Sequence, residues 1–409
     1  MNDNYKTYLK HLLLFVITFF TTTIAGTFWI NARVPFFTEY TLHDFVLGLG
    51  YSVPFLLILT VHEFGHYFMA KFHKVKTTLP FYIPLPPFPA SIGTMGAIIR
   101  IKEHIKSKLI HFDIGIAGPL AGFVIAVAVL IYGYATLPPL DYLFELHPQY
   151  ERYGADYAQY VYTPEFQLQM EKELYQEARM QDSIHAVADG VIKEWDFPAF
   201  TPSEGGLNIA IGKPLLMQFM ELLVEDRSLI PNENELMHYP LLMSGFLALL
   251  VTALNLLPIG QLDGGHVLYG MVGFHWHKRI ATWFFIGLLL YAGMGYISPF
   301  EPQEELIWHL PLYGAFLYFV LRGLRKSKQE TLMLALLILA VQLSVPLFVK
   351  DAHGYSGWLF FALILSRFIG IHHPPAAIEE PLDFKRQALA WLTLIIFIIS
   401  ASPAPIRLG

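Results

Sequence analysis

The chain has 409 residues, of which 55% are hydrophobic and 15% charged, so it carries more apolar surface than one soluble core could bury. It contains no cysteine, which excludes disulfides and cysteine metal sites, so any metal would have to be bound by histidine and carboxylate. The net charge of -6 argues against nucleic acid as a partner. We therefore expect an integral membrane protein, and the long apolar runs predict an all-α polytopic fold and not a β-barrel.

About nine apolar runs approach or exceed the roughly 20 residues that cross a bilayer as a helix. The expected spans are residues 12–30, 45–71, 109–137, 238–258, 279–298, 306–321, 331–349, 356–371 and 388–404. The first run lacks a small-residue cleavage signature, so we interpret it as a retained span. No segment rich in arginine and serine precedes it, which favours a bacterial inner membrane over an organelle.

The distribution of lysine and arginine predicts the orientation, because short cytoplasmic loops are enriched in these residues. If the N-terminus is cytoplasmic, the basic groups at 71–76, 100–108 and 322–328 all fall on the inner side, whereas the short outer loops hold only Arg33 and Lys350. This pattern indicates a cytoplasmic N-terminus and a C-terminus on the outer side.

The second apolar run ends in VHEFGHYFMA, residues 61–70. On a helix, His62 and His66 project from one face, so their imidazoles can bind one metal ion. Glu63 neighbours that face and can take a proton from water at the metal, as in the HExxH pattern of zinc proteases. The alternative is a set of satisfied polar residues in a helix bundle. Burying three such groups in a bilayer costs several kcal/mol unless they are paired or liganded, which favours the metal site.

The segment LPFYIPLPPFP, which precedes GTMGAIIR, cannot form an uninterrupted spanning helix, so we expect a re-entrant or membrane-associated loop near 80–100. An extended edge there could pair with an unwound substrate strand. Gly93, Thr94, Met95 and Gly96 are therefore candidate substrate-binding residues, with a simple glycine turn as the alternative.

A long acidic segment, residues 138–236, interrupts the spans and lies on the outer side in this topology. The simplest interpretation is a solvated cap. Its end, GKPLLMQFMELLVEDR, has apolar residues at helical spacing, which predicts an amphipathic helix on the membrane surface or docked on the bundle. These apolar residues are Leu215, Leu216, Phe219, Leu222 and Leu223.

A second unusual apolar run ends in LNLLPIGQLDGGH, residues 254–266. A catalytic zinc usually has three protein ligands, and the two histidines leave one to find. Pro258 and Gly260 should break the helix, while Gly264 and Gly265 permit close backbone approach, so Asp263 can face a cavity within the bundle. A helix N-cap is the alternative role for this aspartate.

The motifs HEFGH and NLLPIGQLDGG together resemble the core of the site-2 protease family of intramembrane zinc metalloproteases. GTMGAIIR and DIGIAGPLAGF resemble segments of the subgroup found in plastids and bacteria, so the resemblance covers about residues 45–275, without a recognisable PDZ insertion. It implies one Zn²⁺ per chain, held by His62, His66 and Asp263, with Glu63 as the catalytic base. Asn255 matches the asparagine that is thought to steady the substrate or the oxyanion.

The resulting organisation has five parts. These are an N-terminal span and outer loop at 1–44, the first part of a catalytic core at 45–137, the acidic segment at 138–236, the second part of the core at 237–275 and additional helices at 276–409. We expect an endopeptidase that cleaves transmembrane segments of other proteins within the lipid bilayer. A membrane metal-ion carrier, which would not need Glu63 as a base, and a catalytically silent chaperone or adaptor are the alternatives. The oligomeric state is left open.

Overall fold

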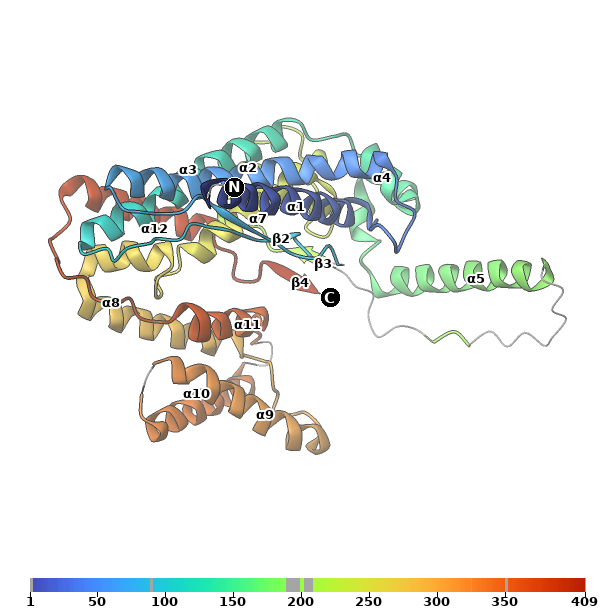
Figure 1. The fold of residues 1–409 in the computed structure, drawn as a ribbon. Coiled ribbons are helices and arrows are strands. Elements are labelled where there is room, and N and C mark those ends of the chain that lie inside the picture. Colours follow the sequence, from blue (N-terminus) through green and yellow to red (C-terminus); the bar gives the residue numbers. More distant parts are fainter. Residues whose placement is uncertain are drawn as a thin grey trace.

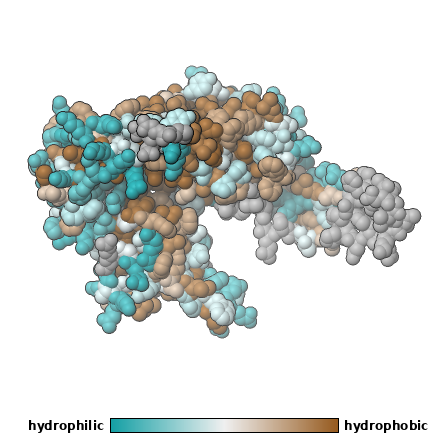
Figure 2. Space-filling view, viewed as in Figure 1, coloured by the Kyte–Doolittle hydropathy of each residue, from teal (hydrophilic) through white to brown (hydrophobic). Residues whose placement is uncertain are grey.

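The computed structural model describes residues 3–88, 91–188, 199–201, 209–324, 326–349 and 352–408. These residues are mostly helical, as expected, and Figure 2 shows hydrophobic side chains over much of the visible face of the helical body. Four helices are long and apolar enough to cross a membrane, namely α1 (Asp3–Asn31), α2 (Leu42–Phe72), α3 (Lys108–Ala135) and α10 (Lys328–Phe348). The expected spans 12–30 and 45–71 lie within α1 and α2, and the expected spans 109–137 and 331–349 match α3 and α10 except for one or two residues at their ends.

The count of nine spans is not confirmed among the described residues. The helix α7 (Pro240–Asn255) has 16 residues and α12 (Phe384–Ser400) has 17, so each is short for a bilayer. A residue with non-helical backbone angles, Gly273, interrupts α8 (Asp263–Ala292). The helix α9 (Gln303–Leu321) has two glutamates in its first turn, and α11 (Gly357–Ile364) has only eight residues.

The helices α1, α2, α3 and α7 form a bundle around one hydrophobic cluster, and α8 packs against α3 beside it (Figure 1). Small residues let the helices approach closely: a Cβ on Gly48 of α2 would lie 2.3 Å from the carbonyl oxygen of Thr23 in α1. Because α2 contacts α1, α3 and α7, its polar residues are enclosed by protein on several sides.

The loop between α2 and α3 contains an antiparallel hairpin of β1 (Phe81–Pro84) and β2 (Thr94–Ile98). Phe81 lies opposite Ile98, and the register shifts between Tyr82 and Pro84, since proline cannot continue the ladder. The hairpin packs against α1 and α2. The prediction that this region does not form a spanning helix is therefore confirmed, although the fold contains short strands and is not purely helical.

The acidic segment is partly folded among the described residues. It comprises α4 (Asp141–Leu146), η1 (Pro148–Gln159), α5 (Pro164–Ala188), β3 (Ile209–Ile211), α6 (Leu215–Glu221), η2 (Arg227–Leu229) and η3 (Leu236–His238). A small aromatic cluster holds α4, η1 and the start of α5 together, and α5 projects away from the bundle (Figure 1). The carboxylates of Asp189, Glu194 and Asp196 lie outside the described residues.

The expected amphipathic helix forms as α6, and it docks on the bundle through the buried side chains of Met217 and Met220. Its other face exposes large apolar side chains at Leu215 and Phe219, and Leu222 and Leu223 directly after it are also exposed. Most of the predicted apolar face is thus turned away from the bundle, and the docking residues Met217 and Met220 were not among those predicted. The exposed apolar side chains suit a membrane surface, which stays a prediction.

The C-terminal helices build a second hydrophobic cluster around the later part of α8, together with α9, α10, α11, η4 (Arg322–Leu324) and η5 (Leu365–Ile369). The helix α12 then returns to pack against α3 and α7. Finally, β4 (Ile406–Leu408) pairs antiparallel with β3. The ring of His11, near the start of α1, lies 2.8 Å from the carbonyl oxygen of Pro80, which directly precedes β1.

Candidate metal centre

Two histidines of α2 and the first residue of α8 bring three potential ligand atoms together. Nε2 of His62 lies 3.1 Å from Nε2 of His66, and Oδ2 of Asp263 lies 3.4 and 3.3 Å from these two nitrogens. Tetrahedral ligands bound at zinc-like distances are separated by about 3.3 Å, so the three atoms can share one ion with little movement. The side chains of both histidines are almost fully buried.

The neighbouring helix α3 orients the second histidine. Nδ1 of His66 lies 2.7 Å from the carbonyl oxygen of Ile114, and because a carbonyl only accepts, Nδ1–H is the donor. Nε2 then keeps a free lone pair that faces Asp263, as a metal ligand requires. The approach depends on small residues of α3, since a Cβ on Gly118 would lie 2.1 Å from Nε2 of His66 and one on Gly122 would lie 3.0 Å from Cβ of His62.

A tight turn between α7 and α8 places the aspartate. The helix α7 ends at Asn255, and Gly260 adopts φ +58° while its N–H donates to the carbonyl of Ile371 at 2.9 Å. A Cβ on Gly264 would lie 1.9 Å from the carbonyl oxygen of Leu256, so only glycine allows this packing. The N-cap of α8 is Leu262, so the alternative of Asp263 as the cap is wrong.

The ligand atoms open into a cavity of about 390 Å³ that is also lined by Glu63 and Asn255. A carboxylate oxygen of Glu63 and one ring nitrogen each of His62 and His66 lie within 4.8 Å of one another. This spacing leaves room for a water molecule beside the metal position. Nδ2 of Asn255 lies 3.4 Å from Nε2 of His62, so the amide also reaches the centre of the cavity.

Gly93 ends the hairpin loop, Thr94, Met95 and Gly96 begin β2, and none of these four residues lines the cavity. Thr94 is fully buried, Met95 is 64% exposed, and Gly93 and Gly96 both have positive φ angles. A Cβ on Gly93 would lie 2.5 Å from Cα of Thr22 in α1, so glycine is required here by packing as well as by conformation.

The cavity wall beside the histidines is instead formed by the next five residues, 97–101. Their position was not predicted, although they directly follow Gly96 in the sequence. Among the described residues β2 pairs only with β1, so its second edge has no strand partner. An edge strand of this kind, beside the cavity that holds the candidate metal ligands, can accept an extended peptide by adding it as a further strand.

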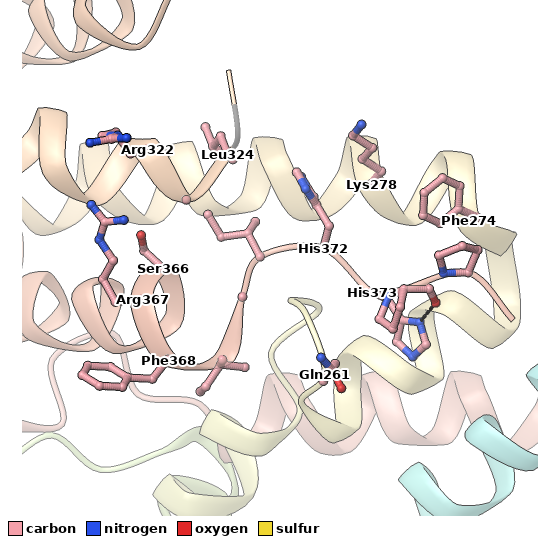
Figure 3. Close-up of a pocket in the computed structure, with 16 residues that line it drawn as sticks. Gln261, Phe274, Lys278, Arg322, Leu324, Ser366, Arg367, Phe368, His372 and His373 are labelled. Carbon is pink, nitrogen blue, oxygen red and sulfur yellow. Dashed lines mark hydrogen bonds between the residues drawn. The ribbon is translucent and has the colours of Figure 1, made fainter. Parts of the chain in front are cut away.

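Sequence reasoning also missed a basic cavity of about 640 Å³ beside the metal centre, which shares Gln261 with it. Figure 3 shows Arg322 beside Arg367, with Lys278, His372 and His373 along the opposite part of the cavity. Residues 372 and 373 lie in a loop that no helix covers. The loop nevertheless brings His373 to within 2.8 Å of His266, which no local pattern indicated.

An HExxH helix joined by a distant aspartate inside a bundle of apolar helices defines the class of membrane metallopeptidases. The chain belongs to peptidase family M50, whose family model matches residues 50–294.

The curated relatives are plant proteins. The chain is 25% identical over 234 residues to the probable zinc metalloprotease EGY1 of Arabidopsis thaliana, covering 57% of this chain and 31% of that protein. It is 27% identical over 285 residues to EGY1 of Oryza sativa subsp. japonica, covering 65% and 38%. It is 26% identical over 235 residues to EGY2 of Arabidopsis thaliana, covering 58% and 30%.

The chain thus spans about a third of the length of these relatives, and no solved structure matches it. All three relatives are described as chloroplastic. The expectation of a bacterial inner membrane therefore gains no support from them, and the predicted orientation of the N-terminus is likewise unsupported.

Proposed function

We propose that the chain is a polytopic zinc endopeptidase that cleaves membrane-spanning segments of other membrane proteins within the lipid bilayer. One observation carries the proposal, which is the convergence of His62, His66 and Asp263 beside the carboxylate of Glu63. Family membership and the zinc metalloproteases among the relatives support the same chemistry.

The residues present suit one Zn²⁺ ion. Two imidazole nitrogens and one carboxylate oxygen make the donor set of a catalytic zinc, which keeps a further position open for substrate or water. When bound, the ion would act as a Lewis acid toward water and the peptide carbonyl. Ile114 holds the ring of His66 in the tautomer that leaves Nε2 available.

Glu63 serves as the general base. Its carboxylate takes the proton from the attacking water and then delivers that proton to the leaving amine, so the residue ends each cycle in its starting state. Asn255 reaches the same cavity from the end of α7. In this proposal its amide donates to the oxygen of the reacting carbonyl and so steadies the substrate.

The substrate must unwind locally, because a helical peptide bond is shielded by its own hydrogen bonds and side chains. The free edge of β2 and the wall formed by 97–101 can receive the extended segment, with Gly93, Thr94, Met95 and Gly96 at the start of this edge. Arg100 and Gln261 also line the cavity, and their polar side chains can form hydrogen bonds with water that enters it.

The test is cleavage of labelled single-span proteins by the purified chain in liposomes. We expect cleavage within the membrane segment, loss of cleavage on zinc chelation, and recovery when zinc is returned. A metal-ion carrier predicts zinc uptake without cleavage, and a silent adaptor predicts neither. If zinc enters the liposomes and no membrane segment is cut by any zinc-loaded preparation, the endopeptidase proposal is wrong.

A further inference from the structure

A second group of metal-binding side chains lies far from the candidate catalytic centre. It consists of His147, which follows α4, together with Glu235 and His238 before α7. The end of α1 joins it through the carbonyl of Ile30, which lies 2.6 Å from Nδ1 of His238. Asp44, which binds Arg33 at this end of the bundle, precedes His62 by 18 residues of α2, or about 27 Å along a helix.

The three ligand atoms face one another at short range. Nε2 of His147 lies 3.1 Å from Nε2 of His238, and Oε2 of Glu235 lies 3.5 and 3.2 Å from these nitrogens. These separations are close to the 3.1–3.4 Å found between His62, His66 and Asp263. Atoms at this spacing can share one tetrahedral ion with bonds of about 2 Å.

Hydrogen bonding leaves the buried carboxylate oxygen of this group without a donor. Nδ1–H of His238 must donate to the carbonyl of Ile30, so Nε2 of the neutral ring carries a lone pair. Oε2 of Glu235 is buried in a residue only 2% exposed, and no hydrogen bond of acceptable geometry reaches it. Nε2–H of His147 can donate to that lone pair at 3.1 Å, but Oε2 of Glu235 then remains without a donor, and a cation bound between the three atoms would satisfy it.

Aromatic residues hold the group in place. The hydroxyl of Tyr162 donates to the other carboxylate oxygen of Glu235, and the ring of Tyr150 stacks on that of His147 with centroids 4.7 Å apart. The hydroxyl of Tyr142 donates to the carbonyl of His238 at 2.7 Å. Outer contacts of this kind orient ligands and fix imidazole tautomers in metal sites.

We propose that His147, Glu235 and His238 bind a second divalent cation, with zinc as the metal that suits two imidazoles and one carboxylate. The ion would join His147 of the acidic segment to the residues that precede α7. Through the contact of His238 with Ile30 it would also stabilise the C-terminal end of α1. This site is independent of the proposed peptidase activity, because none of its residues lines the catalytic cavity.

The other histidine cluster, His111, His266 and His373, does not offer the same argument. Nδ1 of His373 must donate to the carbonyl of Pro374, so its Nε2 can accept from Nδ1–H of His266 at 2.8 Å. That chain of hydrogen bonds satisfies the facing nitrogens without an ion.

The first test is the metal content of the purified full-length protein. We expect two zinc ions per chain in the unchanged protein, one in His147→Ala and one in the double variant His62→Ala/His66→Ala. Combining all three substitutions should leave none. One ion per chain in the unchanged protein, still present in His147→Ala, would overturn the second site. One ion per chain that is lost in His147→Ala but kept in His62→Ala/His66→Ala would instead support the second site and contradict zinc binding at the proposed peptidase centre.

The second test does not depend on His147→Ala folding. The chain has no cysteine, so His147→Cys introduces one thiolate that can replace the imidazole as a metal ligand. After exchange into Co²⁺, this variant should show a sulfur-to-cobalt charge-transfer absorption in the near ultraviolet. The matched control is Glu145→Cys, at an exposed position two residues away, which should show no such absorption. Absence of the absorption in His147→Cys would contradict the site.

Discussion

A Cβ atom on Gly118 would lie 2.1 Å from Nε2 of His66, so α3 meets α2 at the candidate metal centre with no room for any other side chain. The same helix supplies the carbonyl of Ile114 that orients the ring. The ligand geometry in α2 is therefore set by the close approach of α3.

We accordingly predict that Gly118→Ala weakens zinc binding about 10- to 100-fold, the range seen when residues that orient a ligand are changed. The added methyl must displace the ring of His66. The measurement is zinc affinity by competition with a chelating dye. Gly287→Ala is the matched control, because a Cβ at this position in α8 meets nothing within 4 Å. Equal zinc affinity in both variants would show that the contact does not set the site.

Glu63→Gln should retain zinc but lose cleavage. The amide keeps the size of the side chain and removes the base, so the rate should fall by the factor that general-base catalysis supplies, about 10² to 10⁴. Zinc content and cleavage of a single-span substrate are measured on the same preparation, with His62→Ala as the metal-poor control. A normal cleavage rate in Glu63→Gln would rule out this mechanism.

Asp263→Ala should bind zinc weakly, because only His62 and His66 remain to hold the ion. Asp263→Asn should retain more zinc than the alanine variant, since its carbonyl oxygen can still coordinate. Metal analysis of the two purified variants decides the point. If the alanine variant keeps full zinc at the His62/His66 position, the third ligand lies elsewhere.

Arg386→Ala should destabilise the fold, because Nε and Nη2 of Arg386 each donate to Asp113 at 2.7 Å and so join α12 to α3. The remaining partner of Asp113 is His73, at 2.8 Å. Removing one member of a partly buried pair should lower the free energy of unfolding by about 1–3 kcal/mol. Thermal unfolding in detergent measures this, with exposed Lys385→Ala as the control. Identical melting of the two variants would refute the role of the pair.

The topology can be tested in this cysteine-free chain with single cysteines at Lys71 and Met180, which are both exposed. With a cytoplasmic N-terminus, a membrane-impermeant thiol reagent added outside should label position 180 and leave 71 unlabelled. Labelling in opened membranes shows that both cysteines are reactive. The reverse pattern would invert the predicted orientation.

The amino-acid sequence alone was sufficient for the local features. The four-residue spacing of His62 and His66 places both rings on one face of any helix, because the helical period is 3.6 residues. Likewise, Pro258, Gly260 and the paired glycines at 264 and 265 predicted a break before Asp263, which the structure shows as the turn between α7 and α8. The apolar runs predicted α1, α2, α3 and α10 well.

Only the tertiary structure decided how distant segments meet. Residues 97–101 line the metal cavity because the hairpin folds back along α2, and Arg386 reaches Asp113 across 273 residues of sequence. His147 and His238, 91 residues apart, come within 3.1 Å through the packing of the acidic segment on the bundle. Local periodicity determines which face of an element a side chain occupies, but contacts between elements depend on the path of every intervening loop and on mutual packing, and no short pattern encodes these.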